Sequence, residues 1–217
     1  MRSYQVILFD LDGTLSDPKI GITKSVQYAL KKLGIDEPDL DKLEPFIGPP
    51  LQDSFPEWYG LDAEETDRAV RYYREYFKEK GMYENVLFPE IPGLLQELKR
   101  SGRQLVVATS KPTPFAEEIL RYFQIDGYFD LVAGSNLDGT RLAKTEVIEY
   151  ALDQYSDREK RDFVMIGDRK YDVIGANKTG IDSIAVTYGY GSREELLREN
   201  PTYLVSDIQG IREIILA

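Results

Sequence analysis

The chain has 217 residues, 42% of them hydrophobic and 30% charged, which is the composition of a globular protein with one sizeable core or a core and a smaller inserted domain. It contains no cysteine and no histidine, which excludes disulfides, Cys-His and Ser-His-Asp catalysis and histidine zinc sites. The net charge of −11 argues against binding of nucleic acid polymers or anionic membranes through a broad surface.

The N-terminal segment predicts a buried strand. Residues 4–9 form a continuous apolar run with β-branched members, which is typical of a strand covered on both faces. The run is short and ends in Asp10 without a small-residue cleavage site, so we expect no signal peptide. No apolar run approaches the roughly 18 residues of a membrane span. We therefore expect a cytoplasmic protein with no membrane partner.

Residues 17–85 predict a small helical domain inserted after the first strand. Amphipathic patterns at 19–34 and 63–81 predict helices, and no segment between them has convincing strand character. The stretch 45–51, PFIGPPL, carries three prolines and a glycine and so cannot be regular helix. A bent, rigid loop is expected there.

From residue 93 onward, strands are expected to alternate with helices. We expect the sheet to resume near 87–93 and to continue with strands at 104–109, 128–134, 162–168 and 182–189 and helices at 93–102, 115–125 and 145–155. This alternation is the signature of an α/β fold, a Rossmann-like parallel sheet with helices on both faces. Residues 1–16 and 86–217 would form this core domain, and residues 17–85 the helical one.

Polar side chains cluster where the predicted strands end. In an open parallel sheet, functional groups gather at the carboxyl ends of the strands. The sequence places carboxylates, hydroxyls and a cation at these ends: Asp10, Asp12, Thr109, Ser110, Lys144, Asp168 and Asp172. We expect these side chains to share one edge of the sheet. Thr109 and Ser110 could also be an ordinary helix cap ahead of Pro112, but their place at the shared sheet edge favours a phosphate-binding role.

The predicted carboxylates require a cation. Two like charges 4 Å apart at an effective dielectric of 20 repel by about 4 kcal/mol. With only oxygen ligands available, Mg²⁺ is the expected ion, and Asp10 and Asp168 suit it as direct ligands. The ion and Lys144 would make the pocket locally positive. Thr109, Ser110 and the turn at Gly13 could then donate hydrogen bonds to a phosphate.

Four motifs resemble those of the haloacid dehalogenase superfamily. They are FDLDGTL at 9–15, VVATSKP at 106–112, Lys144 and GDRKYDVIGA at 167–176, and their order and spacing match along the whole chain. The helical insertion after the first motif resembles the first type of cap domain in that superfamily. The resemblance implies a Mg²⁺-dependent hydrolase with a Rossmann-like core and a helical cap.

The resemblance also implies individual roles. Asp10 would be the nucleophile that forms an aspartyl-phosphate, and Asp12 would protonate the leaving alkoxide and then deprotonate the hydrolytic water. Thr109 and Lys144 would hold the phosphoryl oxygens, with Lys111 as a rival cation. The Mg²⁺ ligands would be Asp10, the backbone carbonyl of Asp12 and Asp168, with Asp172 completing the acidic shell.

Within the resemblance, a carboxylate at Asp12 argues against dehalogenases and phosphonate hydrolases, which lack it. The absence of histidine argues against sugar phosphomutases, which use a cap histidine, so phosphomonoester hydrolysis is the implied reaction. The substrate would be a small phosphorylated metabolite. The chain most resembles the 5′-nucleotidase and phosphoglycolate phosphatase branches. The sequences FIGPPL, GDRKYDVIGA and YGYGS favour the nucleotidase branch, although a histidine is expected where Tyr171 stands.

Three residues of the inserted domain are candidates for substrate selection. Ile47, Gly48 and Pro49 lie in the rigid loop that could define the leaving-group pocket. Two other classes of protein remain open, a phospho-accepting regulatory module and a non-catalytic binding protein of the same fold. The acid–base position of Asp12 and the cap argue against the first, and the filled motif positions argue against the second. A monomer and a homodimer are both compatible with the sequence.

Overall fold

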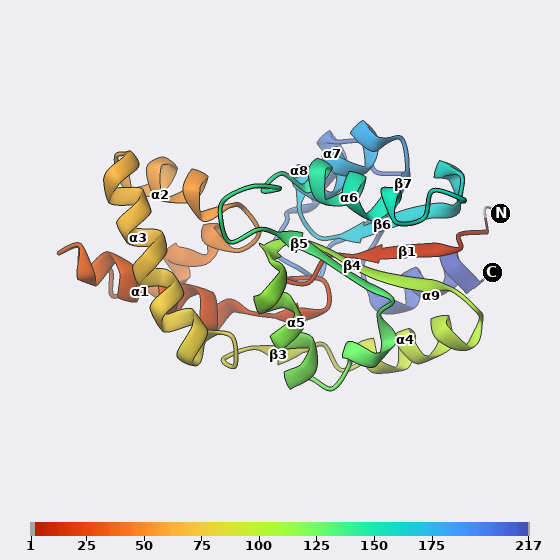
Figure 1. The fold of residues 1–217 in the computed structure, drawn as a ribbon, viewed down its shortest axis with the longest axis horizontal. Helices are drawn as coiled ribbons and strands as arrows, with labels where there is room; N and C mark the ends of the chain where they lie inside the picture. The colour runs from red at the N-terminus through yellow and green to blue at the C-terminus, as the bar shows by residue number, and fades with distance from the viewer. Residues whose placement is uncertain (1–2, 217) are drawn as a thin grey trace. The chain divides into compact units, whose positions relative to one another are not determined.

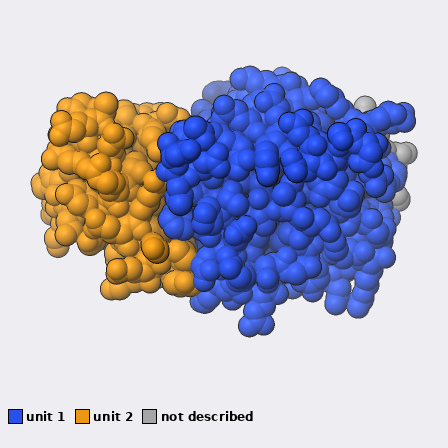
Figure 2. Space-filling model, viewed as in Figure 1, with its two compact units in different colours: residues 1–16, 87–217 blue, residues 17–86 orange. Residues whose placement is uncertain are grey.

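The structure, a computed structural model, describes residues 3–216. By its internal contacts the chain divides into two compact units, unit 1 within residues 1–16 and 87–217 and unit 2 at residues 17–86 (Figure 2). The chain therefore leaves unit 1 after the first strand and returns to it 70 residues later. Each unit has its own arrangement of elements.

Unit 1 contains a parallel sheet in which the described residues supply six strands in the order β5-β4-β1-β6-β7-β8. The strands are β1 (Val6–Phe9), β4 (Gln104–Pro112), β5 (Leu131–Ser135), β6 (Phe163–Gly167), β7 (Asp182–Val186) and β8 (Tyr203–Val205). The α/β architecture with a parallel sheet, predicted from the alternating apolar runs, is confirmed. The central strands β1 and β6 are buried along their whole length, as the continuous apolar runs require.

Helices cover both faces of this sheet. They are α4 (Ile91–Arg100), α5 (Thr113–Tyr122), α6 (Lys144–Asp153), α7 (Lys170–Thr179), α8 (Arg193–Arg198) and α9 (Ile208–Leu216). Helices α6 and α7 lie on one face and α4 and α9 on the other (Figure 1). Right-handed crossovers explain this division, because the chain moves outward from β1 in one direction through β4 and β5 and then back in the other.

The core under α6 and α7 is built from strand residues that face the same side. Val6 and Leu8 of β1 pack with Val147 and Ile148 of α6, all without exposed surface, and Ala176 of α7 closes the cluster. Burying such side chains contributes about 1.5–3 kcal/mol for each large aliphatic group. This packing fixes the start of α6 and α7 against the strand ends.

Unit 2 is helical. It contains α1 (Lys19–Lys32), the 3₁₀ segment η1 (Leu40–Phe46), α2 (Leu51–Tyr59), α3 (Ala63–Tyr76) and the π-helical segment η2 (Phe77–Gly81). Helix α3 starts with a capping box between Asp62 and Glu65. The expected single helix over 63–81 changes to π geometry at Phe77. The end of this π-helical segment packs tightly on α1, since a Cβ added at Gly21 of α1 would overlap the carbonyl oxygen of Gly81.

The prediction that the main sheet resumes at 87–93 is wrong. Residues 86–87 do form a short strand, β3 (Val86–Leu87), but it pairs with β2 (Ser16–Asp17) in a separate two-stranded sheet. Residues 91–100 belong to α4, and the main sheet resumes with β4. Pro89 and Pro92 explain the difference, because a proline donates no backbone hydrogen bond to a sheet.

Candidate active site

Three neighbouring strands end at the same edge of the sheet in unit 1. Strand β1 lies between β4 and β6, with Phe9 paired to Val107 on one side and to Ile166 on the other. Asp10 follows β1 directly, and Asp168 follows β6. This register brings the polar residues after each strand to the same level, as the sequence analysis expected.

Three carboxylates meet at this edge. Asp10, Asp168 and Asp172 each offer one carboxylate oxygen, and these oxygens lie within 4.8 Å of one another. Their residues are 4%, 0% and 1% exposed. Asp172 reaches the cluster from the first turn of α7, where its Oδ2 accepts a hydrogen bond from Arg169 N at 3.0 Å. Three buried carboxylates at this separation repel one another unless a cation or protons neutralise them.

Lys144 is one cation of the cluster. It is the first residue of α6, and its Nζ lies 2.9 Å from Asp10 Oδ1 and 2.8 Å from Asp172 Oδ1. The same Nζ donates a hydrogen bond to the carbonyl oxygen of Ala108 in β4 at 3.0 Å. Lys144 therefore links three strand ends, β1, β4 and the segment after β6. The sequence placed this lysine near the strand ends, and its assignment to the site rested mainly on the family resemblance.

Lys111 pairs with a different carboxylate. Its Nζ lies 2.9 Å from Asp12 Oδ2, and both side chains are less than 10% exposed. The register between β4 and β5 shifts between Ala108 and Pro112, and Lys111 lies inside this irregularity. The two lysines that the sequence presented as rivals thus lie at one site, where Lys111 pairs with Asp12 and Lys144 pairs with both Asp10 and Asp172.

Thr109 and Ser110 also lie in this irregular segment. Thr109 is buried, and its Oγ1 accepts a hydrogen bond from Lys111 N at 3.2 Å. The carbonyl oxygen of Ser110 accepts a hydrogen bond from Ser135 Oγ at 2.8 Å. These contacts order the segment and hold it against β5, while the Lys111–Asp12 pair joins it to the turn after β1.

The turn after Asp10 depends on glycine. Gly13 has φ +80°, in the left-handed region, and a Cβ there would lie 2.3 Å from Asp168 Oδ2. Thr14 follows, fully buried, and its Oγ1 donates a hydrogen bond to Asp168 Oδ1 at 3.1 Å. The DLDGT motif therefore supplies Asp10 and Asp12 and also packs against Asp168 from the neighbouring strand.

The loop after β7 also supports Asp168, a contribution that the sequence analysis missed. Tyr190 N donates a hydrogen bond to Asp168 Oδ2 at 2.8 Å. A Cβ at Gly189 would lie 2.4 Å from Asp168 Cβ, so a larger residue does not fit there. The available signal was the glycine-aromatic pattern YGYG at 188–191, which entered the sequence analysis only as part of the family resemblance.

Burial and mutual repulsion shift the acidities of these groups. Burial, with the nearby Asp172 and Asp10 charges, raises the pKa of Asp168 to about 8. Burial and Asp10 raise the pKa of Asp172 to about 6 against the opposing effect of Lys144. Burial also raises the pKa of Asp12, although Lys111 opposes the shift. For Lys144 burial alone would lower the pKa, but Asp10 and Asp172 raise it above its usual range.

The buried residues fit a divalent metal ion. Four carboxylates and two ammonium groups are buried at this edge, Asp10, Asp12, Asp168, Asp172, Lys111 and Lys144. With every group ionised they sum to −2, which a divalent cation balances. The oxygen-only donor set suits a hard cation. In addition, Asp12 Oδ1 is buried without a hydrogen-bond partner among the described residues.

The candidate selectivity loop lies in unit 2. Ile47 is fully buried, directly after η1, and Gly48 has φ +105°. Pro50 precedes the first residue of α2. A left-handed glycine followed by two prolines makes this loop bent and stiff, as the composition predicted.

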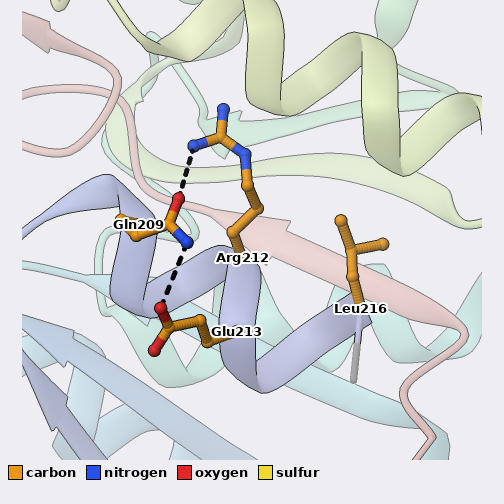
Figure 3. A pocket seen from close by; sticks show the side chains of 4 residues that line it. All are labelled: Gln209, Arg212, Glu213 and Leu216. Carbon is orange, nitrogen blue, oxygen red and sulfur yellow. Dashed lines mark hydrogen bonds between the residues drawn. The ribbon is translucent and has the colours of Figure 1, made fainter.

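A surface pocket on α9 differs from the buried carboxylate site because its polar side chains pair with one another. It is lined by Gln209, Arg212, Glu213 and Leu216 (Figure 3). Arg212 donates to Gln209 at 3.2 Å, and Gln209 donates to Glu213 at 3.1 Å. Arg212 also pairs with Glu97 of α4 at 2.7 Å. Its polar groups hydrogen-bond to one another, so the pocket offers no buried polar atom that awaits a ligand.

Comparison with known proteins identifies the family. The haloacid dehalogenase-like hydrolase family matches residues 7–186. The chain belongs to this family. It is a phosphatase-type member, as the four motifs implied. No helix within residues 3–216 is both long enough and apolar enough to cross a membrane.

Several relatives cover nearly the whole chain. A 5′-nucleotidase of Pseudomonas aeruginosa is 50% identical over 98% of this chain and 96% of its own. The tyrosine-protein kinase PtkA of Mycobacterium tuberculosis is 39% identical over 98% of this chain and 72% of its own. A phosphoglycolate phosphatase of Colwellia psychrerythraea is 29% identical over 94% and 93%. The solved structure of a predicted phosphatase from Clostridium acetobutylicum, 50% identical, superimposes with a TM-score of 0.95 over 99% of both chains.

Proposed function

We propose that this phosphatase hydrolyses the phosphate ester of nucleoside 5′-monophosphates with Mg²⁺ as its metal. The observation that carries the substrate class is the 50% identity to a 5′-nucleotidase over nearly the full length of both chains. The buried carboxylate and lysine cluster supports the reaction type. Its residues supply a nucleophile, an acid–base group and counter-charges for a phosphate within one site.

Asp10 is the proposed nucleophile. Its Oδ1 pairs with Lys144 and accepts a hydrogen bond from Leu11 N at 2.8 Å, so Oδ2 is the oxygen assigned to attack phosphorus. The attack forms an aspartyl-phosphate and breaks the bond between phosphorus and the ester oxygen. A covalent carboxylate intermediate divides the hydrolysis into two easier steps.

Asp12 is the proposed acid and base. Its raised pKa favours a protonated carboxyl before the first step, and Lys111 holds Oδ2 in place. Asp12 gives its proton to the ester oxygen as the nucleoside leaves. It then accepts a proton from the water that attacks the phosphorus of the aspartyl-phosphate, which releases phosphate and restores Asp10.

The remaining residues hold the phosphate and the metal. Lys144, Thr109 and Ser110 are proposed to hold the phosphoryl oxygens. Bound Mg²⁺ would neutralise charge on the transferring phosphoryl group. The residues proposed to hold it are Asp10, the backbone carbonyl of Asp12 and Asp168, with Asp172 beside them. Residues 17–86 are proposed to act as the cap domain, in which Ile47, Gly48 and Pro49 select the leaving group. The cytoplasmic location stays a prediction from the sequence.

The test is a side-by-side screen of purine and pyrimidine nucleoside 5′-monophosphates and phosphoglycolate with Mg²⁺. We expect kcat/KM for the best nucleotide to exceed that for phosphoglycolate by roughly 10-fold or more, about 1.4 kcal/mol of transition-state binding. The reverse preference would favour phosphoglycolate phosphatase, the second candidate, which the more distant relative supports. Equal rates would indicate a broad-specificity phosphatase and contradict the nucleotidase proposal.

A further inference from the structure

The loop after β7 contacts the metal-site aspartate and the DLDGT turn at the same time. Tyr190 N and the space at Gly189 hold Asp168, as described above. Tyr188, the residue before Gly189, contacts the DLDGT turn instead of Asp168. Its hydroxyl donates a hydrogen bond to the carbonyl oxygen of Thr14 at 2.9 Å. Thr14 in turn donates from Oγ1 to Asp168 Oδ1 at 3.1 Å.

These contacts hold both oxygens of one carboxylate. Asp168 Oδ1 is held through Thr14 and Tyr188, and Oδ2 is held directly by Tyr190 N. Gly13 and Gly189 contact the same side chain so closely that neither position has room for a Cβ. A carboxylate with both oxygens held keeps one orientation, which is what a metal ligand needs when its own neighbours repel it.

The Tyr188 side chain is itself fixed. Its ring meets the ring of Phe88 edge-on, with centroids 5.2 Å apart and an interplanar angle of 78°. Phe88 N donates a hydrogen bond to the carbonyl oxygen of Leu15 at 3.1 Å. Leu15 and Phe88 belong to unit 1, where the chain leaves for unit 2 and where it returns. The Tyr188 hydroxyl therefore has little freedom to choose another acceptor.

We propose that Tyr188 is a positioning residue for the metal site, and that its hydroxyl, through Thr14, fixes the orientation in which Asp168 binds the divalent ion. This inference deepens the proposed function, since it assumes that the carboxylate cluster holds Mg²⁺. Tyr188 itself contacts neither the ion nor the phosphate. The Thr14 hydroxyl is the direct partner of the carboxylate, and Tyr188 supports that partner.

The experiment measures Mg²⁺ affinity by calorimetry in the absence of substrate, on the full chain. Replacing a partner of a metal ligand costs roughly 10–100-fold in affinity, so we expect that loss for Thr14→Val. Tyr188→Phe keeps the ring on Phe88 and removes only the hydroxyl. Because it acts one contact further away, we expect a smaller loss, roughly 3–10-fold.

The double variant Thr14→Val/Tyr188→Phe tests the route. If Tyr188 acts through Thr14, the double variant binds Mg²⁺ about as weakly as Thr14→Val alone, because neighbouring residues in one network are not additive. If the double variant instead loses Mg²⁺ affinity by the product of the two single-variant factors, Tyr188 does not act through Thr14. Unchanged affinity in Tyr188→Phe would overturn the positioning role.

The matched control is Tyr4→Phe. It also removes a phenol hydroxyl from a hydrogen bond, here to Asp182 Oδ2 at 2.6 Å, but Tyr4 precedes β1 and so lies at the opposite end of that strand. We expect a lower Tm with unchanged Mg²⁺ affinity. A loss of affinity equal to that of Tyr188→Phe would show that general destabilisation explains both and would overturn the inference.

The metal measurement is independent of the substrate proposal. If wild-type protein fails to hydrolyse nucleotides but the variants weaken Mg²⁺ binding as expected, the positioning role stands and the nucleotidase proposal falls. If nucleotides are hydrolysed while Tyr188→Phe binds Mg²⁺ normally, the nucleotidase proposal stands and the positioning role of Tyr188 falls. In nucleotide-hydrolysing protein we further expect Tyr188→Phe activity to recover at high Mg²⁺ with KM for the nucleotide unchanged, and unrecovered activity would contradict positioning through the metal.

Discussion

The ion pairs at the sheet edge of unit 1 are far more buried than the ion pairs of unit 2. At the sheet edge of unit 1, Lys144 and its partners Asp10 and Asp172 have side chains less than 10% exposed. In unit 2, Lys24 pairs with Glu84 while their side chains remain 39% and 28% exposed. Pairs on the surface stabilise a fold by about 1 kcal/mol or less. Buried charges are costly to bring out of water, so their retention in unit 1 indicates function, whereas the pairs of unit 2 serve ordinary surface packing.

The largest expected effect is on activity in unit 1. Asp10→Asn keeps the shape of the side chain and removes the oxygen proposed as the nucleophile, so we expect kcat to fall by roughly 10⁴-fold or more, to background. Steady-state phosphate release from the best phosphate ester found in the substrate screen measures this fall. Residual activity above one tenth of wild type would show that Asp10 is not the nucleophile.

A large effect on stability is expected at Lys144. Lys144→Met leaves Asp10 and Asp172 buried without their shared cation, and breaking a buried pair from one side costs about 3–5 kcal/mol. Denaturant unfolding near neutral pH measures the loss. Part of the lost stability should return at lower pH, because protonation of Asp172, whose pKa burial raises, removes one of the two unpaired charges. A loss below about 1 kcal/mol would mean that the pair behaves like a surface pair.

An intermediate effect on folding stability is expected from Mg²⁺ binding, and the size of this effect should depend on pH. In the metal-free protein, folding raises the pKa of Asp168 to about 8 and that of Asp172 to about 6. The folded state therefore binds protons more tightly than the unfolded chain, and its stability falls as pH rises from about 4 to 8. Mg²⁺ needs the ionised carboxylates, so it should counteract this fall.

Thermal unfolding with Mg²⁺ and with a chelator checks this prediction. An ion present at 100 times its Kd stabilises the fold by about 2.7 kcal/mol. We expect Mg²⁺ to raise Tm more at about pH 8.5 than at about pH 5.5, because protons compete with the ion for the carboxylates at the lower pH. An equal gain at both pH values would place the ion away from these carboxylates.

The smallest effect is expected in unit 2. Lys24→Met removes the pair with Glu84, which also accepts a hydrogen bond from Tyr76 at 3.2 Å. We expect a stability loss of about 1 kcal/mol or less and unchanged kcat, since the pair is exposed. This variant is the matched control for Lys144→Met. A loss as large as that of Lys144→Met would remove the distinction between the two sets of pairs.

The strand ends could be predicted from the sequence because local patterns determine them. Asp10 and Asp168 each follow a continuous apolar run, and parallel strands bring such positions to one edge without further information. The position of Lys144 opposite Asp10 and Asp172 depends on how α6 packs on the sheet, which no local pattern specifies. Its role therefore entered through the family resemblance.

Other parts of the site depend on contacts between distant segments. Lys111 reaches Asp12 because the register of β4 and β5 shifts at this point, and a shift in pairing leaves no clear mark in one strand's sequence. The support of Asp168 by Tyr190 and Gly189 joins segments more than 20 residues apart. The strand β8 (Tyr203–Val205) was not predicted, because three residues are too short to show alternation.

The most direct test of the account is to trap the covalent intermediate. Wild-type protein would be mixed with the best phosphate ester from the substrate screen and Mg²⁺, quenched in acid within the first turnover, digested and analysed by mass spectrometry. The account predicts a phosphorylated peptide with the modification on Asp10, and no such peptide from Asp10→Asn. Continued turnover of wild-type protein with Asp10 unmodified at every quench time, or with phosphate on another residue, would contradict the central claim that the buried sheet edge of unit 1 acts through Asp10.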